Sequence, residues 1–152
     1  MYKINSLLLK DFYKATHLSM IPANMTKSVS YYTPRKSRIE RWPKVVNFGL
    51  QMFIKNWLID EFNENFFKRP YMDVVYEYQR VMDYSMGHGV CNTDKIAALH
   101  NLGYLPIEIV SLPEGMLVPM GCPIFGITNT HKDFAWLPQA LESLISAEMW
   151  YP

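Results

Sequence analysis

The densest positive charge in the sequence lies at residues 33–44, which read TPRKSRIERWPK. The planar guanidinium of arginine can donate two parallel hydrogen bonds to a pair of phosphate oxygens. A loop stiffened by proline can hold the guanidinium in place with little loss of conformational entropy. Arg35, which follows Pro34, is therefore a candidate for binding a polyphosphate. The same run also fits a loop that only faces water, and basic residues beside aromatic ones also fit contact with nucleic acid.

A second cluster, DFYKATH at residues 11–17, combines a carboxylate, a phenol, a cation and an imidazole. Asp11 is a good N-terminal cap for the helix predicted to follow, and a lone histidine such as His17 is usually a hydrogen-bonded structural residue. Asp11 and Tyr13 are two positions apart, so they point to different sides of a helix but to one side of an extended segment. If both serve one site, we expect the chain to be non-helical at Asp11.

Other catalytic motifs are absent from the sequence. It contains neither G-x-G-x-x-G nor a Walker-type loop, and no serine or cysteine stands in a recognisable nucleophile motif. His88 and Cys91 have a spacing that suits zinc, but no second pair of ligands follows them. The residues therefore favour neither a protein-held metal nor a covalent nucleophile.

The composition is that of one globular domain spanning residues 1–152, since 49% of the residues are apolar and 14% are aromatic. The formal net charge is +1, so no overall field attracts nucleic acid or anionic lipid. The apolar run near the amino end is three leucines long, too short for a signal peptide or a membrane span. We therefore expect a cytoplasmic protein with no nucleic-acid or membrane partner, in which Cys91 and Cys122 are reduced and packed.

Five stretches of the sequence are predicted to be helical. They lie at about residues 11–20, 49–62, 71–84, 93–102 and 135–149. Gly103 is placed to end the fourth, and Pro138 is tolerated in the first turn of the fifth. The apolar face of the last helix carries Leu137, Leu141, Leu144, Ile145 and Met149.

Residues 28–33 and the stretch 105–128 have the composition of strands. Within 105–128, three short runs at 105–111, 116–118 and 123–128 are separated by turns in which Gly115 and Gly121 supply a left-handed residue. We therefore predict a three-stranded antiparallel meander with tight hairpins. Helices, a small antiparallel sheet and a final helix give an α+β fold, not the βαβ alternation of a complete barrel enzyme.

Several of these segments together resemble the nicotinamide phosphoribosyltransferase family of type II phosphoribosyltransferases. The similar segments are LKDFYKATH at 9–17, SVSYYTPRKSR at 28–38, NFGLQ at 47–51, LPIEI at 105–109, PEG at 113–115, WL at 136–137 and WYP at 150–152. They span nearly the whole chain but only the first third or so of a family member. The resemblance implies an amino-terminal domain, with helices packed on a small antiparallel sheet, that lacks the α/β barrel following it in the family.

In that family, nicotinamide displaces pyrophosphate from 5-phosphoribosyl 1-pyrophosphate and forms nicotinamide mononucleotide, a step of NAD salvage. The resemblance implies Mg²⁺ carried by the substrate phosphates and ATP hydrolysis as an optional drive. The transition state is oxocarbenium-like and the leaving group is charged. Such a reaction needs cations positioned near the leaving group and a site where the ring can stack, and it does not need a protein nucleophile.

The resemblance implies that Tyr13 stacks on the pyridine ring, that Asp11 lies beside it and that Arg35 reaches the phosphates. It also implies a homodimer in which these residues enter the active site of the partner subunit. His17 does not match the family's phosphorylated histidine, which belongs to the part beyond this chain. We therefore expect substrate contacts and dimer surface here, no catalytic acid, base or nucleophile, and no activity from the chain alone.

Two alternatives remain open. The same domain could belong to a nicotinate phosphoribosyltransferase, because the residue that reads the amide lies downstream in the family. The chain could instead be a non-catalytic binding or assembly module. Since the usual neighbours of the last helix would be missing, we also expect exposed apolar surface on that helix.

Overall fold

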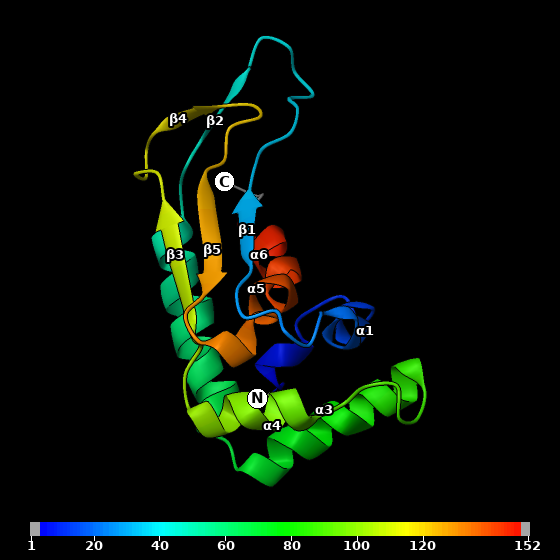
Figure 1. The fold of residues 1–152 in the computed structure, drawn as a ribbon. Helices are drawn as coiled ribbons and strands as arrows, with labels where there is room; N and C mark the ends of the chain where they lie inside the picture. The colour runs from blue at the N-terminus through cyan, green and yellow to red at the C-terminus, as the bar shows by residue number, and fades with distance from the viewer. Residues whose placement is uncertain (1–3, 150–152) are drawn as a thin grey trace.

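A computed structural model describes residues 4–149 of the chain. The strands lie toward one end of an elongated molecule, and helices α3 (Tyr71–Met86) and α4 (Asp94–Leu102) form the other end (Figure 1). Within these residues, all strand pairings are antiparallel and belong to two small sheets. The predicted α+β class, with helices packed on small antiparallel sheets, is confirmed.

The larger sheet joins strands that are far apart in the sequence. Its order is β1 (Val29–Tyr32), β5 (Phe125–Asn129) and β3 (Ile107–Ser111). In the central strand β5, the alternate residues Phe125, Ile127 and Asn129 are buried. Because successive side chains of a strand point to opposite faces, the core lies on one face of this sheet.

The predicted three-stranded meander is wrong. The middle run forms β4 (Leu117–Pro119), which pairs with β2 (Lys44–Val46) in a separate sheet, while β3 and β5 pair with each other. The two turns therefore connect different sheets and do not close hairpins. The left-handed conformation predicted for Gly115 and Gly121 is confirmed, with φ of 86° and 83°.

Asn47 explains this change of partner. Its backbone N–H donates to the carbonyl of Met116 at 2.9 Å, and its backbone carbonyl accepts from the N–H of Gly115 at 2.7 Å. Its side-chain amide donates to the carbonyl of Leu112 at 2.6 Å. Because Asn47 is buried and satisfies these backbone groups, the chain that leaves β3 turns toward β2.

The four helices predicted before the strands of residues 105–128 are present. Helix α1 (Lys14–Met20) begins later than expected, α3 and α4 lie where they were predicted, and α4 ends before Gly103, whose φ is 82°. The helix predicted at 49–62 is longer than expected. It consists of α2 (Leu50–Phe53) and wider π-type turns over Ile54–Glu61 and Asn63–Phe67.

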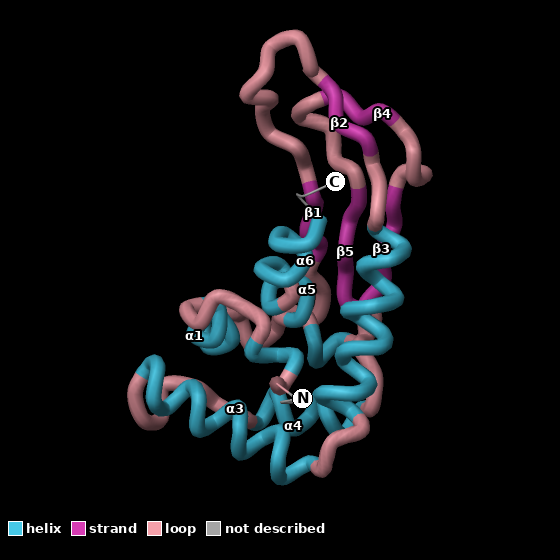
Figure 2. Tube along the Cα trace, turned by 180° about the vertical axis from the view of Figure 1, so that it is seen from behind, coloured by secondary structure: helices cyan, strands magenta, loops and turns pink. Residues whose placement is uncertain are grey.

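This long helical segment runs beside β3, as Figures 1 and 2 show from opposite sides. A groove of about 490 Å³ lies between them, with Ile54 and Leu58 on the helix and Ile107 and Ile109 on the strand. Phe62 and Phe66 of the same segment are fully buried in the hydrophobic core.

The final helix is interrupted at Leu141, which separates α5 (Leu137–Ala140) from α6 (Glu142–Met149). Pro138 lies in the first turn of α5, as predicted. The exposed apolar surface expected on this helix is wrong, because its apolar face packs into the core. All five residues of that face are buried: Leu137, Leu141, Leu144, Ile145 and Met149. The WYP segment at 150–152 lies outside the described residues.

Among the described residues, apolar side chains are exposed on the outer face of the larger sheet instead. Val29 and Tyr31 of β1 and Val110 of β3 are each more than half exposed. They are paired with Gly126 and Thr128 of β5, which alternate with the buried residues of that strand, so they lie on the sheet face opposite the core.

Candidate functional site

Asp11 and Tyr13 lie in a turn that precedes α1. The N–H of Lys14 donates to the carbonyl of Asp11 at 3.0 Å, and the helix begins at Lys14. Asp11 is therefore outside the helix, which is the condition stated above for Asp11 and Tyr13 to serve one site. Both residues are exposed, Tyr13 by 55%.

The interpretation of Asp11 as the cap of this helix is wrong. The cap position is Tyr13, which makes no side-chain capping bond. The carboxylate of Asp11 instead accepts a hydrogen bond from the hydroxyl of Ser143 in α6 at 2.8 Å. The oxygen of that hydroxyl accepts in turn from the backbone N–H of Asp11 at 3.0 Å. Asp11 is thus bound to α6 through both its backbone and its side chain.

The ring of Tyr13 has one aromatic neighbour among the described residues. His17, one helical turn further on, meets it edge-on with 5.3 Å between ring centroids. The ammonium of Lys14 lies 5.8 Å from the centroid of the Tyr13 ring. His17 therefore supports the ring of Tyr13. It does so by a ring contact, and among the described residues no hydrogen bond of its imidazole accompanies this contact.

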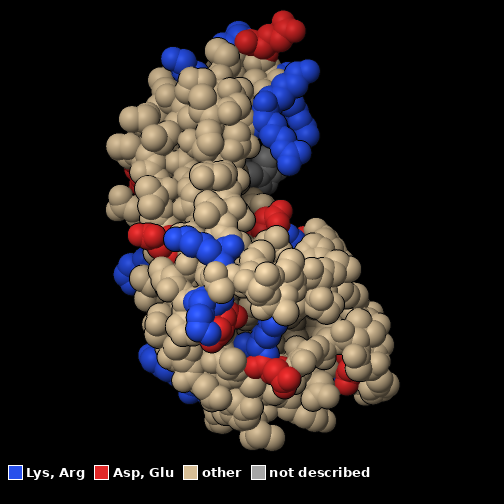
Figure 3. All heavy atoms as spheres, viewed as in Figure 1, with Lys and Arg blue, Asp and Glu red and all other residues tan. Residues whose placement is uncertain are grey.

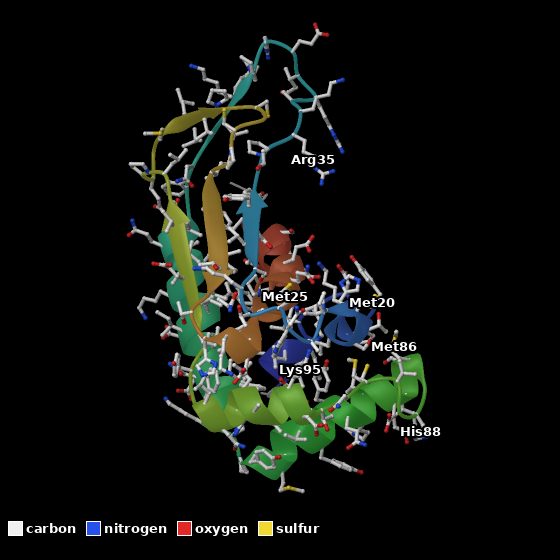
Figure 4. The ribbon with its side chains drawn as sticks, viewed as in Figure 1. Met20, Met25, Arg35, Met86, His88 and Lys95 are labelled. Carbon is white, nitrogen blue, oxygen red and sulfur yellow. The ribbon has the colours of Figure 1, made fainter. Side chains whose placement is uncertain are left out.

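Arg35 follows β1 and lines a pocket of about 440 Å³ between the larger sheet and the last helices. Figure 4 shows it on the loop beyond β1, on the side of α6. The residue is exposed, and within residues 4–149 no hydrogen bond or ion pair engages its guanidinium. Other residues of the pocket wall include Tyr32, Phe125, Pro138, Glu142 and Ile145. The guanidinium is therefore available to an anion that enters the pocket.

Tyr32 and Phe125 form a rigid part of this wall. They are directly opposite each other on β1 and β5, and their rings stack with centroids 5.0 Å apart and planes 4° apart. Burial raises the pKa of the Tyr32 phenol, so this residue is neutral at physiological pH.

The loop that carries Arg35 is the most basic surface near the pocket. Figure 3 shows Lys and Arg side chains gathered along one side of the strand end of the molecule. The exposed cations between β1 and β2 are Arg35, Lys36, Arg38 and Arg41, followed by Lys44 at the start of β2. The local potential is therefore positive although the whole chain is nearly neutral.

The first turn of α6 connects the two parts of the candidate site. Glu142 lines the pocket of Arg35, and its carboxylate lies 2.5 Å from the ammonium of Lys14. Ser143, the next residue, binds Asp11. Sequence reasoning missed Lys14, Glu142 and Ser143 as site residues, because their partners are 128 and 132 positions away and no local motif marks them.

A buried polar cluster adjoins the turn at Asp11. The ammonium of Lys10 donates to the hydroxyl of the fully buried Tyr78 at 2.9 Å. Burial lowers the pKa of Lys10 to about 8, against a small opposing effect of Cys91. Burial also raises the pKa of Tyr78 and of Cys91. Cys91 and Cys122 are free thiols, and Cys122 is exposed rather than packed as predicted.

The described part of the chain offers no group of three or more His, Cys, Asp or Glu side chains that could hold a metal ion. His88 lies 3.3 Å from the carboxylate of Asp83 and is itself exposed. No helix within residues 4–149 is both long and apolar enough to cross a membrane.

The chain is similar to proteins of known activity. Residues 5–109 match the family model described as the N-terminal domain of nicotinamide phosphoribosyltransferase. The chain is 42% identical over 154 aligned residues to a nicotinamide phosphoribosyltransferase of Acinetobacter baylyi, covering 98% of this chain and 30% of that protein. It is 28% identical to a nicotinamide phosphoribosyltransferase of Xanthomonas campestris, covering 99% of this chain and 30% of that protein. The chain thus spans about 30% of the length of these relatives.

A solved structure with a similar fold is human nicotinic acid phosphoribosyltransferase. The TM-score is 0.60 at 16% identity, covering 91% of this chain and 25% of that one. At this identity the similarity supports the fold alone, and it agrees with the predicted amino-terminal domain of a type II phosphoribosyltransferase.

Proposed function

Because the chain belongs to the nicotinamide phosphoribosyltransferase family, we propose that it forms the amino-terminal part of an enzyme that makes nicotinamide mononucleotide. The observation that carries this proposal is the match to the family model over residues 5–109. Asp11, Tyr13 and Arg35 all lie within that match. The proposed contribution of the chain is substrate contact and dimer surface, as part of NAD biosynthesis in the cytoplasm.

In the proposed reaction, the ring nitrogen of nicotinamide attacks C1 of 5-phosphoribosyl 1-pyrophosphate. The bond from C1 to the pyrophosphate oxygen breaks, and pyrophosphate leaves with the bonding electrons. Positive charge grows on the sugar and negative charge on the leaving group. Cations fixed near the leaving group and a nicotinamide ring held in position therefore accelerate the step. No residue of this chain needs to act as a nucleophile.

Arg35 is the proposed contact to the phosphates. Its exposure, its position on a pocket and the absence of a protein partner among the described residues support this role. A guanidinium that is not already paired can form two parallel hydrogen bonds to phosphate oxygens.

Tyr13 is the proposed stacking partner of the pyridine ring, with Asp11 beside it. The 55% exposure of Tyr13 and its support by His17 are compatible with an aromatic ring that is held but uncovered. Exposed aromatic residues in the same turn, Phe12 and Tyr13, also suit a surface that another subunit covers. We propose that these residues act across a homodimer interface, in the active site of the partner subunit.

The residues around Arg35 do not fit a Mg²⁺ site made of protein ligands. Among the described residues, the one carboxylate of the pocket wall belongs to Glu142, which is already paired with Lys14. We therefore propose that Mg²⁺ arrives with the substrate phosphates, which supply its ligands together with water. Optional ATP hydrolysis is likewise a proposal, made from the family resemblance alone.

The proposed function can be tested with a chimeric protein. This chain replaces the matching residues of the Acinetobacter baylyi relative, and product formation from nicotinamide is measured by chromatography. We expect the chimera to form nicotinamide mononucleotide, the isolated chain to form none, and the unmodified relative to serve as the positive control. A chimera that folds and assembles like the relative but makes no product would favour the non-catalytic module instead.

A further inference from the structure

We propose that Glu142 and Ser143, the first two residues of α6, are positioning residues that hold the turn 11–14 in its working orientation. This inference rests on the proposed function, since it assigns a catalytic purpose to contacts that the fold already contains. Neither residue is proposed to form or break a bond with the substrate in the reaction.

Ser143 fixes Asp11 at two points. Its hydroxyl oxygen accepts from the backbone N–H of Asp11 at 3.0 Å, and its hydroxyl proton is donated to the carboxylate at 2.8 Å. A serine hydroxyl has one donor and can also accept, so this geometry uses both capacities. The double contact fixes the direction of the Asp11 carboxylate as well as the position of its backbone.

Glu142 fixes the other end of the turn. The side chain of Lys14 is 3% exposed, and its ammonium lies 2.5 Å from the carboxylate of Glu142. A charge buried this far is held firmly in place, because leaving its partner would cost free energy. Tyr13 lies between the two fixed residues, so its ring is carried by a turn that is bound to α6 on both sides.

Glu142 also joins this turn to the pocket of Arg35, which it lines. An unpaired carboxylate at that wall would repel a polyphosphate. The ammonium of Lys14 offsets this charge, so the guanidinium of Arg35 remains the dominant charge that an entering anion meets. One ion pair therefore serves both the ring-binding turn and the phosphate pocket.

The first experiment measures whether the contact with Ser143 orders the turn, independently of any activity. Amide hydrogen exchange of Asp11 is followed by NMR in the chain, in Ser143→Val and in Ser143→Thr. Valine and threonine have the same shape, but only threonine keeps the hydroxyl. We expect exchange at Asp11 to be about fivefold faster in Ser143→Val, corresponding to one lost hydrogen bond, and nearly unchanged in Ser143→Thr. Equal rates in all three proteins would overturn the proposed contact.

The second experiment measures kinetics in the chimera described above. We expect Ser143→Val to raise the KM for nicotinamide about fivefold and to change the KM for 5-phosphoribosyl 1-pyrophosphate less than about twofold. Ser143→Thr should restore the wild-type values. A purely structural contact would instead lower the amount of folded enzyme and leave both KM values unchanged, and that result would overturn the positioning role.

A third variant, Glu142→Gln, tests the shared ion pair. It should raise the KM for nicotinamide, because the turn loses its anchor, and lower the KM for 5-phosphoribosyl 1-pyrophosphate, because a negative charge leaves the pocket. Two shifts in the same direction would contradict the shared role. An inactive wild-type chimera would overturn the proposed function and the catalytic purpose of the contact, whereas the amide exchange rates would still decide whether the contact orders the turn.

Discussion

The ammonium of Lys14 lies 2.5 Å from the carboxylate of Glu142, although the Lys14 side chain is 3% exposed and the Glu142 side chain 65%. The two partners of this ion pair therefore differ in what their removal leaves behind. Glu142→Ala leaves a buried ammonium without its carboxylate, whereas Lys14→Met leaves an exposed carboxylate in water.

We expect Glu142→Ala to lower the free energy of unfolding by about 3 kcal/mol and Lys14→Met by about 1 kcal/mol. Urea denaturation of both variants measures the difference. Lys55→Met, which removes an ion pair in which both side chains are exposed, is the control and should change stability by less than about 1 kcal/mol. A larger loss in Lys14→Met than in Glu142→Ala would contradict this account.

Lys10 gives the protein a pH-dependent stability at alkaline pH. Its pKa falls from the ordinary value of 10.5 to about 8 in the folded chain. At pH values between 8 and 10.5, Lys10 is protonated in the unfolded chain but not in the folded chain, so the free energy of unfolding rises with pH. Below pH 8, Lys10 is protonated in both states. The rise is on the order of 3 kcal/mol, at about 1.4 kcal/mol for each pKa unit.

The measurement is the free energy of unfolding of the wild type and of Lys10→Met from pH 7 to pH 10.5. Both proteins also carry Cys91→Ser, because Cys91 interacts electrostatically with Lys10 and its titration would change in the variant. We then expect the protein with Lys10 to gain stability relative to the variant across this range, because titrating groups that do not interact with Lys10 cancel in the comparison. A difference that is constant with pH would show that Lys10 keeps an ordinary pKa.

Arg35→Ala should weaken the binding of 5-phosphoribosyl 1-pyrophosphate in the chimera. A hydrogen bond to a charged group contributes about 1.5–3 kcal/mol, so we expect the KM for this substrate to rise at least about tenfold. The KM for nicotinamide should change less than about twofold. Arg38→Ala is the matched control, since Arg38 is exposed in the same loop but does not line the pocket. Equal changes of KM in the two variants would indicate that Arg35 is a solvated loop residue.

Asn47→Asp should destabilise the fold because Asn47 is 1% exposed and its amide donates to the carbonyl of Leu112. An aspartate would place a buried carboxylate against that carbonyl, at an expected loss of about 3 kcal/mol at neutral pH. Burial should raise the pKa of the new carboxyl, and its protonated form can donate, so the loss should shrink as pH falls toward 4. Thermal unfolding at pH 7 and pH 4 measures this, with the exposed Asn101→Asp as control.

The sequence alone predicted the parts of the fold that local patterns encode. Helices α3 and α4 follow from apolar spacing and from Gly103, and the turns follow from Gly115 and Gly121. The pairing of β2 with β4 could not be predicted, because it depends on contacts of Asn47 with residues about 65 positions away. Local composition does not record which strands meet.

The candidate site also has a part that could be predicted from the sequence and a part that could not. The chemistry of Asp11, Tyr13 and Arg35 was visible in their residue types and in the family resemblance, and their contacts to substrate stay a prediction. Glu142 and Ser143 were not visible, because a glutamate and a serine at the start of a helix are ordinary residues there. Their proposed role as positioning residues depends on their contacts with the turn 11–14, which only the structure shows.

The place of β5 in the middle of the larger sheet affects how the protein is made. During synthesis, β1 and β3 leave the ribosome first, and neither can pair with the other across the position that β5 will occupy. Their backbone edges stay open to other nascent chains until residue 129 has emerged. Slow translation of the stretch after β3 would therefore prolong the period in which these strand edges are exposed.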